Sequence, residues 1–222
     1  SKGNLVRSFS SAEDKNYKRY DGAPPADPTL NKSKGLNRFV WNMLYSTMKG
    51  VTNVYVEAGY RAHKASPGKY TFTLQAGNQK QQTTAEILPN PLYNFSAADY
   101  ELYHQTLNSV ETELSTMHTM VSLLEGKRAQ IEMMLKNIST EEKYKSVKNA
   151  GEALVKKMKA WDEDMVQRKT KAYDDAENFP NKFTANYLFL INQMQHDLPI
   201  VTQSALNRTK EMNEKWAQLK VK

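Results

Sequence analysis

Histidines and carboxylates are the residues of this sequence with the clearest capacity for chemistry, and one pair has a spacing used in metal sites. Glu101 and His104 form a Glu-x-x-His element, which places a carboxylate and an imidazole on one helical face, as in di-iron bundles. Such a site needs a second element of this kind and two further glutamates, and the sequence supplies neither. His104 and His118 lie 14 residues apart, about 21 Å along a helix, which is too far for one ion. The sequence therefore predicts no metal site and no cofactor.

Acidic pairs provide general acid–base chemistry only where a cleft raises the pKa of one carboxyl group. The sequence has no Gly-x-Ser-x-Gly elbow, no phosphate-binding glycine loop and no cysteine. The mixed charges around its acidic pairs indicate solvated helical surface instead. We therefore predict no catalytic residue in this chain and a structural place for the pairs Glu111 with Glu113, Asp162 with Asp164, and Asp174 with Asp175.

Several aromatic residues in the first half of the chain could stack on sugar rings. Alternation with polar residues assigns Trp41 and Tyr70 to a buried strand face instead. Tyr55 and Tyr60 lie in a less regular segment, so they are the better exposed candidates for carbohydrate contact. A carbohydrate-binding accessory module is accordingly one alternative function for the chain.

Residues 1–92 have the two-residue period of strands, so they predict an Ig/fibronectin-like β-sandwich domain. We expect strands near residues 5–10, 38–45, 54–57, 69–75 and 83–88, with a turn at Gly77-Asn78 and a core containing Trp41, Tyr70 and Phe72. Five strands are fewer than the roughly seven of a complete sandwich. We therefore expect a domain cut at its N-terminus and completed by upstream residues or another fragment of the same polypeptide.

Residues 93–222 have helical periodicity and predict an antiparallel up-down-up three-helix bundle, which makes the whole chain a segregated α+β protein. The first helix starts at a capping box, Ser96–Asp99, and runs for about 40 residues. The second starts at 139–142, and the third follows Asn178–Pro180 and is broken by Pro199. The expected core includes Leu107, Leu114, Trp161, Leu190 and Trp216, with Gly151 allowing two helices to approach closely. A coiled-coil dimer is the alternative for so long a heptad, but short reversals favour an intramolecular bundle.

The net charge of +7 lies entirely in the predicted strand region, where residues 1–95 carry 13 basic and 6 acidic side chains. These basic residues are scattered through loops rather than aligned on one helix, which argues against a nucleic-acid partner. No apolar run approaches the roughly 20 residues of a membrane-spanning helix. We predict neither nucleic-acid binding nor a membrane span.

Three segments resemble a known family: GLNRFVWNMLY at 35–45, GYRA at 59–62 and PGKYTFTL at 67–74, followed by a proline-bearing exit and long helices. They are similar to the C-terminal region of bacterial secreted BNR-repeat, sortilin-like β-propeller proteins, which are often labelled glycosyl hydrolases. Asn42 stands where that family usually has Asp, and Asn90-Pro91-Leu92 replaces its Asp-Pro-Arg exit. The propeller and its Asp-box repeats are absent from these 222 residues. The resemblance thus implies an extracytoplasmic protein, periplasmic or secreted, whose activity resides outside this segment.

These observations predict a non-catalytic C-terminal structural and interaction module of a larger exported propeller protein. Its expected partners are the remainder of its own polypeptide, a protein or second copy bound through the helices, or a glycan. The second alternative function is part of a hydrolase whose active site lies mainly upstream.

Overall fold

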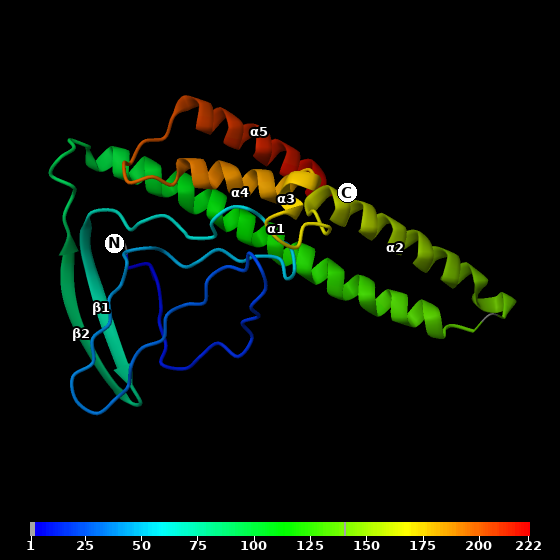
Figure 1. Cartoon of the computed structure of the whole chain (residues 1–222), viewed down its shortest axis with the longest axis horizontal. Helices are drawn as coiled ribbons and strands as arrows, with labels where there is room; N and C mark the ends of the chain where they lie inside the picture. Colours follow the sequence, from blue (N-terminus) through cyan, green and yellow to red (C-terminus); the bar gives the residue numbers. More distant parts are fainter. Residues whose placement is uncertain (1–2, 140) are drawn as a thin grey trace.

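The computed structural model describes residues 3–139 and 141–222, so the expected start of the second helix at 139–142 includes one residue, Thr140, outside the described part. In these residues a β-hairpin precedes a set of helices (Figure 1). The elements are β1 (Gly68–Ala76), β2 (Gln79–Ile87), α1 (Ala97–Asn137), the short 3₁₀ turn η1 (Glu142–Tyr144), α2 (Lys145–Met165), α3 (Asp175–Asn178), α4 (Phe183–Met194) and α5 (Gln203–Lys220).

The predicted β-sandwich is wrong. In the described residues, the sheet consists of β1 and β2 alone, and the segment before them contributes one isolated bridge, between Leu44 and Lys64. The runs expected as strands near residues 5–10, 38–45 and 54–57 are irregular, and Met43 and Asn53 have positive φ angles of 60° and 58°. The apolar side chains of this segment pack on helices rather than on a second sheet, because Met48, Val51 and Val54 belong to the same buried cluster as α1 and α4.

The β1–β2 hairpin retains the alternation that the sequence predicts. Its strands are antiparallel with Gly68 opposite Ile87 and Ala76 opposite Gln79, and Gly77-Asn78 forms the expected two-residue turn. Gly77 has a φ of 57° at this turn, a conformation that favours glycine. Trp41 packs edge-on against Tyr70 and Phe72 of β1, each at 5.9 Å between ring centroids. Trp41 therefore lies against the face of the hairpin that carries these two rings.

Helix α1 is the central helix, against which α2 and α4 pack, and it begins where the sequence predicts. The Ser96 hydroxyl accepts a hydrogen bond from the Asp99 backbone N–H, and the Asp99 carboxylate accepts one from the Ser96 N–H, which completes a capping box. The heptad positions of its first half are buried: Tyr103, Leu107, Val110, Leu114, Met117 and Val121. None of the helices described combines the length and apolar character needed to cross a membrane.

The helices form a different bundle from the expected three. Helices α2 and α4 lie one after the other along α1 and run in the same direction, and α5 turns back over α4 (Figure 1). The predicted single third helix with a break at Pro199 is therefore wrong: the chain reverses there between two antiparallel helices. The expected reversal near residue 178 is absent, since the chain passes from α2 to α4 without changing direction. The predicted bundle core is nevertheless confirmed, because Leu107, Leu114, Trp161, Leu190 and Trp216 are all buried.

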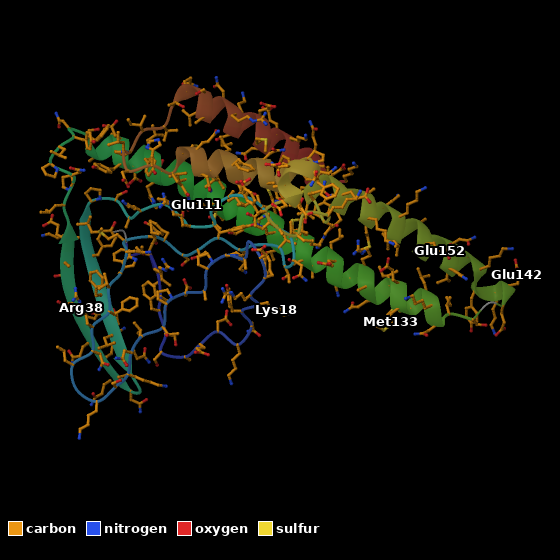
Figure 2. All side chains as sticks on the ribbon, in the orientation of Figure 1. Lys18, Arg38, Glu111, Met133, Glu142 and Glu152 are labelled. Atoms are coloured by element: carbon orange, nitrogen blue, oxygen red, sulfur yellow. The ribbon has the colours of Figure 1, made fainter. Side chains whose placement is uncertain are left out.

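The far ends of α1 and α2 project from the rest of the molecule as a two-helix arm, residues 122–154 (Figures 1 and 2). No described residue of the arm is buried, and Leu123, Met133 and Met134 are between 61% and 70% exposed. Gly151 faces α1 closely, since a Cβ built on it would lie 2.7 Å from Leu135 Cδ2. This confirms the predicted close approach of the two helices at Gly151.

The two glycines of the arm give a direct test of this packing. Gly126→Ala is expected to stabilise the chain by about 0.5–1 kcal/mol, because alanine restricts the unfolded chain and its Cβ would meet nothing within 4 Å. Gly151→Ala is expected to stabilise it less, because the new Cβ must displace Leu135. Thermal unfolding of both variants measures the difference. A Gly151→Ala protein more stable than Gly126→Ala would contradict the close contact.

Candidate functional site

The best-defined polar site is a hydrogen-bonded chain of three side chains, Glu111, His63 and His104, called here the His–Glu–His cluster. The Glu111 carboxylate lies 2.8 Å from His63 Nδ1 and accepts a second hydrogen bond from the His63 backbone N–H at 2.9 Å. The other ring nitrogen of His63, Nε2, lies 2.8 Å from His104 Nδ1. His63 is 2% exposed and Glu111 6% exposed, so the hydrogen bonds between them form away from bulk water, whereas His104 is half-buried.

Two separate parts of the chain position the cluster. Helix α1 carries His104 and Glu111 seven residues apart, which places both on one face two turns apart. His63 comes from the irregular segment, where its carbonyl accepts a hydrogen bond from the Tyr45 N–H at 3.1 Å. The Tyr45 ring stacks on both imidazoles, with centroid distances of 4.5 Å to His63 and 5.2 Å to His104.

The end of α4 closes the cluster from a third direction. The Gln195 side-chain amide donates to Glu111 Oε1 and to the Arg61 carbonyl, both at 2.7 Å. Glu111 therefore accepts hydrogen bonds from the His63 backbone, the His63 ring and Gln195. The Tyr103 hydroxyl donates to the His196 carbonyl at 2.9 Å beside it. The cluster joins the irregular segment, α1 and the end of α4.

Burial sets the protonation of the groups around the cluster. It lowers the pKa of His104, and the neighbouring His63 lowers it further, while Glu101 and Glu111 act in the opposite direction. Burial also raises the pKa of Tyr45 and of Tyr103 to about 12. The two phenols remain protonated at neutral pH. With the Glu111 carboxylate accepting from His63 Nδ1, the Nε2 atom of His63 is left to accept a hydrogen bond from His104 Nδ1.

A second buried carboxylate, Asp162, lies at the end of α2. It is 2% exposed and receives two hydrogen bonds from Arg168, at 2.9 Å from Nε and 2.7 Å from Nη2. The same guanidinium donates to Glu125 of α1 at 3.0 Å. The expectation of solvated surface is therefore wrong for Asp162 and Glu111. Both carboxylates are buried and paired, and Asp162 fastens the end of α2 to α1.

The aromatic residues proposed for carbohydrate contact do not share an exposed face. Tyr60 is 4% exposed, so its expected exposure is wrong, and its ring lies 6.1 Å from that of His118. Tyr55 is half-buried, and its ring lies so close to Gly22 that a Cβ there would be 2.6 Å from Tyr55 Cδ2. The rings of Tyr55 and Tyr60 therefore contact different residues and do not form one exposed surface for a sugar ring.

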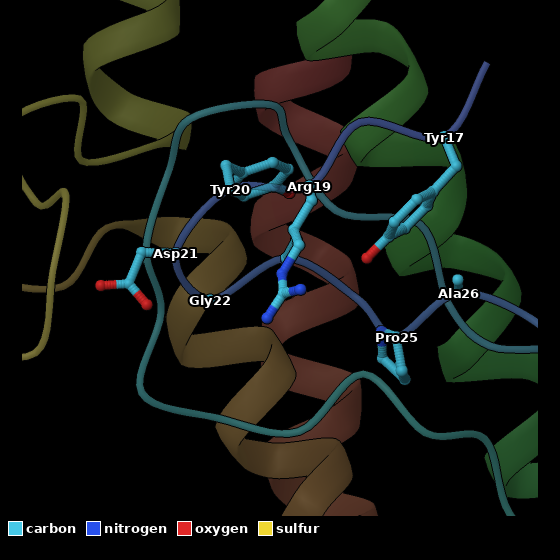
Figure 3. A pocket seen from close by; sticks show the side chains of 8 residues that line it. Tyr17, Arg19, Tyr20, Asp21, Gly22, Pro25 and Ala26 are labelled. Carbon is cyan, nitrogen blue, oxygen red and sulfur yellow. The ribbon is translucent and has the colours of Figure 1, made fainter. Parts of the chain in front are cut away.

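Two cavities lie in the irregular segment, away from the cluster. The larger, about 710 Å³, is an open hollow lined by the loop shown in Figure 3, in which the Tyr17 hydroxyl donates to the Pro24 carbonyl at 2.9 Å. Its lining residues are Tyr17, Arg19, Tyr20, Asp21, Gly22, Ala23, Pro25 and Ala26. The smaller, about 260 Å³, is lined by Tyr20, Asp21, Asn53 and Lys171. Neither Tyr55 nor Tyr60 lines either of these cavities.

The β-hairpin presents a surface of another kind. Every residue from Gln79 to Glu86 in β2 is exposed, and β2 forms the outer margin of the molecule in Figure 1. Within the described residues, 3–139 and 141–222, no backbone hydrogen bond from outside the hairpin reaches β2. On the apolar face of the hairpin, Phe72 is 40% and Leu74 63% exposed. β2 therefore has an open outer edge, and the hairpin has an incompletely covered face.

Sequence reasoning missed the His–Glu–His cluster because His63 lies 48 residues from Glu111 in a segment without regular periodicity. The available signal was the seven-residue spacing of His104 and Glu111 on one face of a long helix. In the described residues, no group of three or more His, Asp or Glu side chains is arranged to hold a metal ion. Comparison of the chain with protein-family models, with curated proteins and with solved structures finds no match.

Proposed function

We propose that this chain is a non-catalytic structural and interaction module whose β-hairpin accepts an extended strand. The observation that carries the proposal is the open edge of β2, a nine-residue strand that is exposed from Gln79 to Glu86 and, in the part of the chain that the structure describes, pairs with β1 alone. Following the family resemblance, the added strand belongs to the remainder of the same polypeptide, an exported propeller protein. The extracytoplasmic setting is part of this proposal.

Hydrogen-bond geometry makes β2 a suitable template. The two-residue turn makes Ala76 and Gln79 a hydrogen-bonded pair, so the residues between such pairs direct their N–H and C=O groups outward. In β2 these are Lys80, Gln82, Thr84 and Glu86. A third strand would satisfy these groups through main-chain hydrogen bonds. It would also convert a two-stranded ribbon, which is marginal by itself, into a three-stranded sheet.

The composition of β2 supports this use of its edge. Exposed edges are commonly protected by proline, by bulges or by several charges. β2 has no proline, its pairing with β1 is continuous, and six of its nine residues are glutamine, threonine or alanine. The region before α1 carries the whole basic excess of the chain. A strand of neutral or negative charge is therefore the favoured occupant.

One substitution tests the proposal at a single backbone group. Thr84→Pro removes an outward N–H without removing a β1–β2 hydrogen bond, so it is expected to weaken binding of the propeller region at least tenfold. Thr84→Val, which keeps the N–H and the side-chain shape, is the matched control and should bind as the natural chain does. Calorimetric titration with the separately produced propeller region at pH 7.5 measures both affinities. Equal affinity of the proline and valine variants would refute strand addition at β2.

A further inference from the structure

The base of the hairpin is fastened to α1 through the His–Glu–His cluster. His63 lies five residues before the first residue of β1, and Ser66 lies between them. The Ser66 hydroxyl contacts the Tyr100 carbonyl of α1 at 3.5 Å, and the Ser66 carbonyl accepts a hydrogen bond from the Tyr70 hydroxyl at 2.6 Å. The Ala65 N–H donates to the Met43 carbonyl at 2.7 Å. Release of His63 would free the residues that lead directly into β1.

We infer that His63, His104 and Glu111 form an acid-sensitive latch, which holds the hairpin base on α1 at neutral pH and releases it when both imidazoles are protonated. The inference rests on the proposed function, because it concerns regulation of the same hairpin. It arises from the one short contact in the cluster that joins two ring nitrogens, His63 Nε2 and His104 Nδ1, at 2.8 Å.

The number of protons that the His63–His104 contact can hold explains why the cluster is sensitive to acid. A hydrogen bond between two ring nitrogens holds one proton, with the other nitrogen as the acceptor. The pair can therefore be neutral or carry one positive charge while the contact persists. With both rings protonated, two N–H groups and two positive charges would face each other across the contact. That state requires separation of the rings, and the separated rings can each bind water.

Charged and titratable groups from every packed element lie around the pair. Glu101 and Glu111 of α1 favour protonation of His104, whereas burial and His63 lower its pKa from the usual 6.5. The second proton is therefore bound more weakly in the latched state than in the released state, so acid favours release below about pH 6.5. Lys64 of the irregular segment and Asp197, which follows α4, form an ion pair at 2.5 Å beside the cluster. The remaining groups around it are Tyr45 and Arg61 of the irregular segment, Tyr103 of α1, and Gln195 and His196 after α4.

Hydrogen exchange of the intact chain tests the latch. The reporter amides are the N–H groups of Tyr45, His63 and Ala65, and the amides of Leu114 and Ile191 in the core are references. Between pH 7.5 and pH 5, protection of the reporters is expected to fall at least tenfold relative to the references, after correction for intrinsic rates. In His104→Asn, which cannot bind the second proton, the reporters should keep their relative protection. His104→Gln is the second variant if the asparagine protein does not fold.

The exposed His196 supplies the matched control, since its ring lies beside Tyr103 rather than against either imidazole of the cluster, and its carbonyl contact survives substitution. His196→Asn should lose reporter protection as the natural chain does. The latch is refuted if the natural chain and His104→Asn lose protection at the same pH, or if reporters and references exchange together. Strand addition is tested at pH 7.5 with Thr84→Pro, where the latch is closed, so either idea can fail while the other stands.

Discussion

Glu111→Ala is expected to lower the free energy of unfolding by about 3–5 kcal/mol. The substitution removes a buried carboxylate that accepts hydrogen bonds from the His63 backbone, the His63 ring and Gln195. These donors would remain buried without an acceptor, and each unsatisfied group costs roughly 1–3 kcal/mol. Urea unfolding at pH 7.5 measures the loss.

Glu152 on the arm provides the control for Glu111 (Figure 2), because it is exposed and Glu152→Ala should change stability by less than about 0.5 kcal/mol. A cost below about 1 kcal/mol for Glu111→Ala would show that water replaces the carboxylate. That result would also remove the physical basis of the latch.

Acidification is expected to destabilise the chain through His118, which is 2% exposed. Burial lowers the pKa of His118 to about 4, against a partial opposing effect of its hydrogen bond to the Lys49 carbonyl. The unfolded chain binds this proton near pH 6.5, so the stabilisation is complete above that pH and is lost as pH falls toward 4. At about 1.4 kcal/mol for each pKa unit, the loss amounts to roughly 3 kcal/mol.

Substitution of His118 separates this effect from general acid unfolding. His118→Gln can donate an amide N–H to the Lys49 carbonyl but cannot titrate, so its stability should fall less between pH 7 and pH 4.5. The control is His196→Gln, an exposed position where the acid dependence should be that of the natural chain. Urea unfolding at several pH values gives both curves. Parallel curves for His118→Gln and the natural chain would show that His118 titrates normally.

The helical half was predictable because its signal repeats over many turns. The heptad of α1 determines that Leu107 and Leu114 are buried, and the capping box determines where the helix begins. The direction of each following helix has no such local signal. Pro199 disfavours a helix that continues from α4 into α5, but only the packing of α5 on α4 decides that the chain reverses between them.

The residues before α1 were predicted less well. Alternation of apolar and polar residues indicates that one face of a segment is buried, but it does not identify what covers that face. Val54 and Val56 alternate as a strand would, yet they pack into the helical core. Their neighbour Tyr55 donates its N–H to the Thr170 carbonyl, 115 positions later, rather than to a second strand. The partners of His63 are likewise distant in sequence, so no local pattern could reveal the cluster.

The continuity of α1 gives the molecule a mechanical property. One uninterrupted helix carries Glu111 in its first half and the end of the arm, Asn137, in its second. At 1.5 Å per residue these positions are about 39 Å apart, so a rotation of about 5° at Glu111 would displace the tip by about 3 Å. A small change in the tilt of α1 beneath the hairpin would therefore become a larger displacement at the opposite end of the molecule.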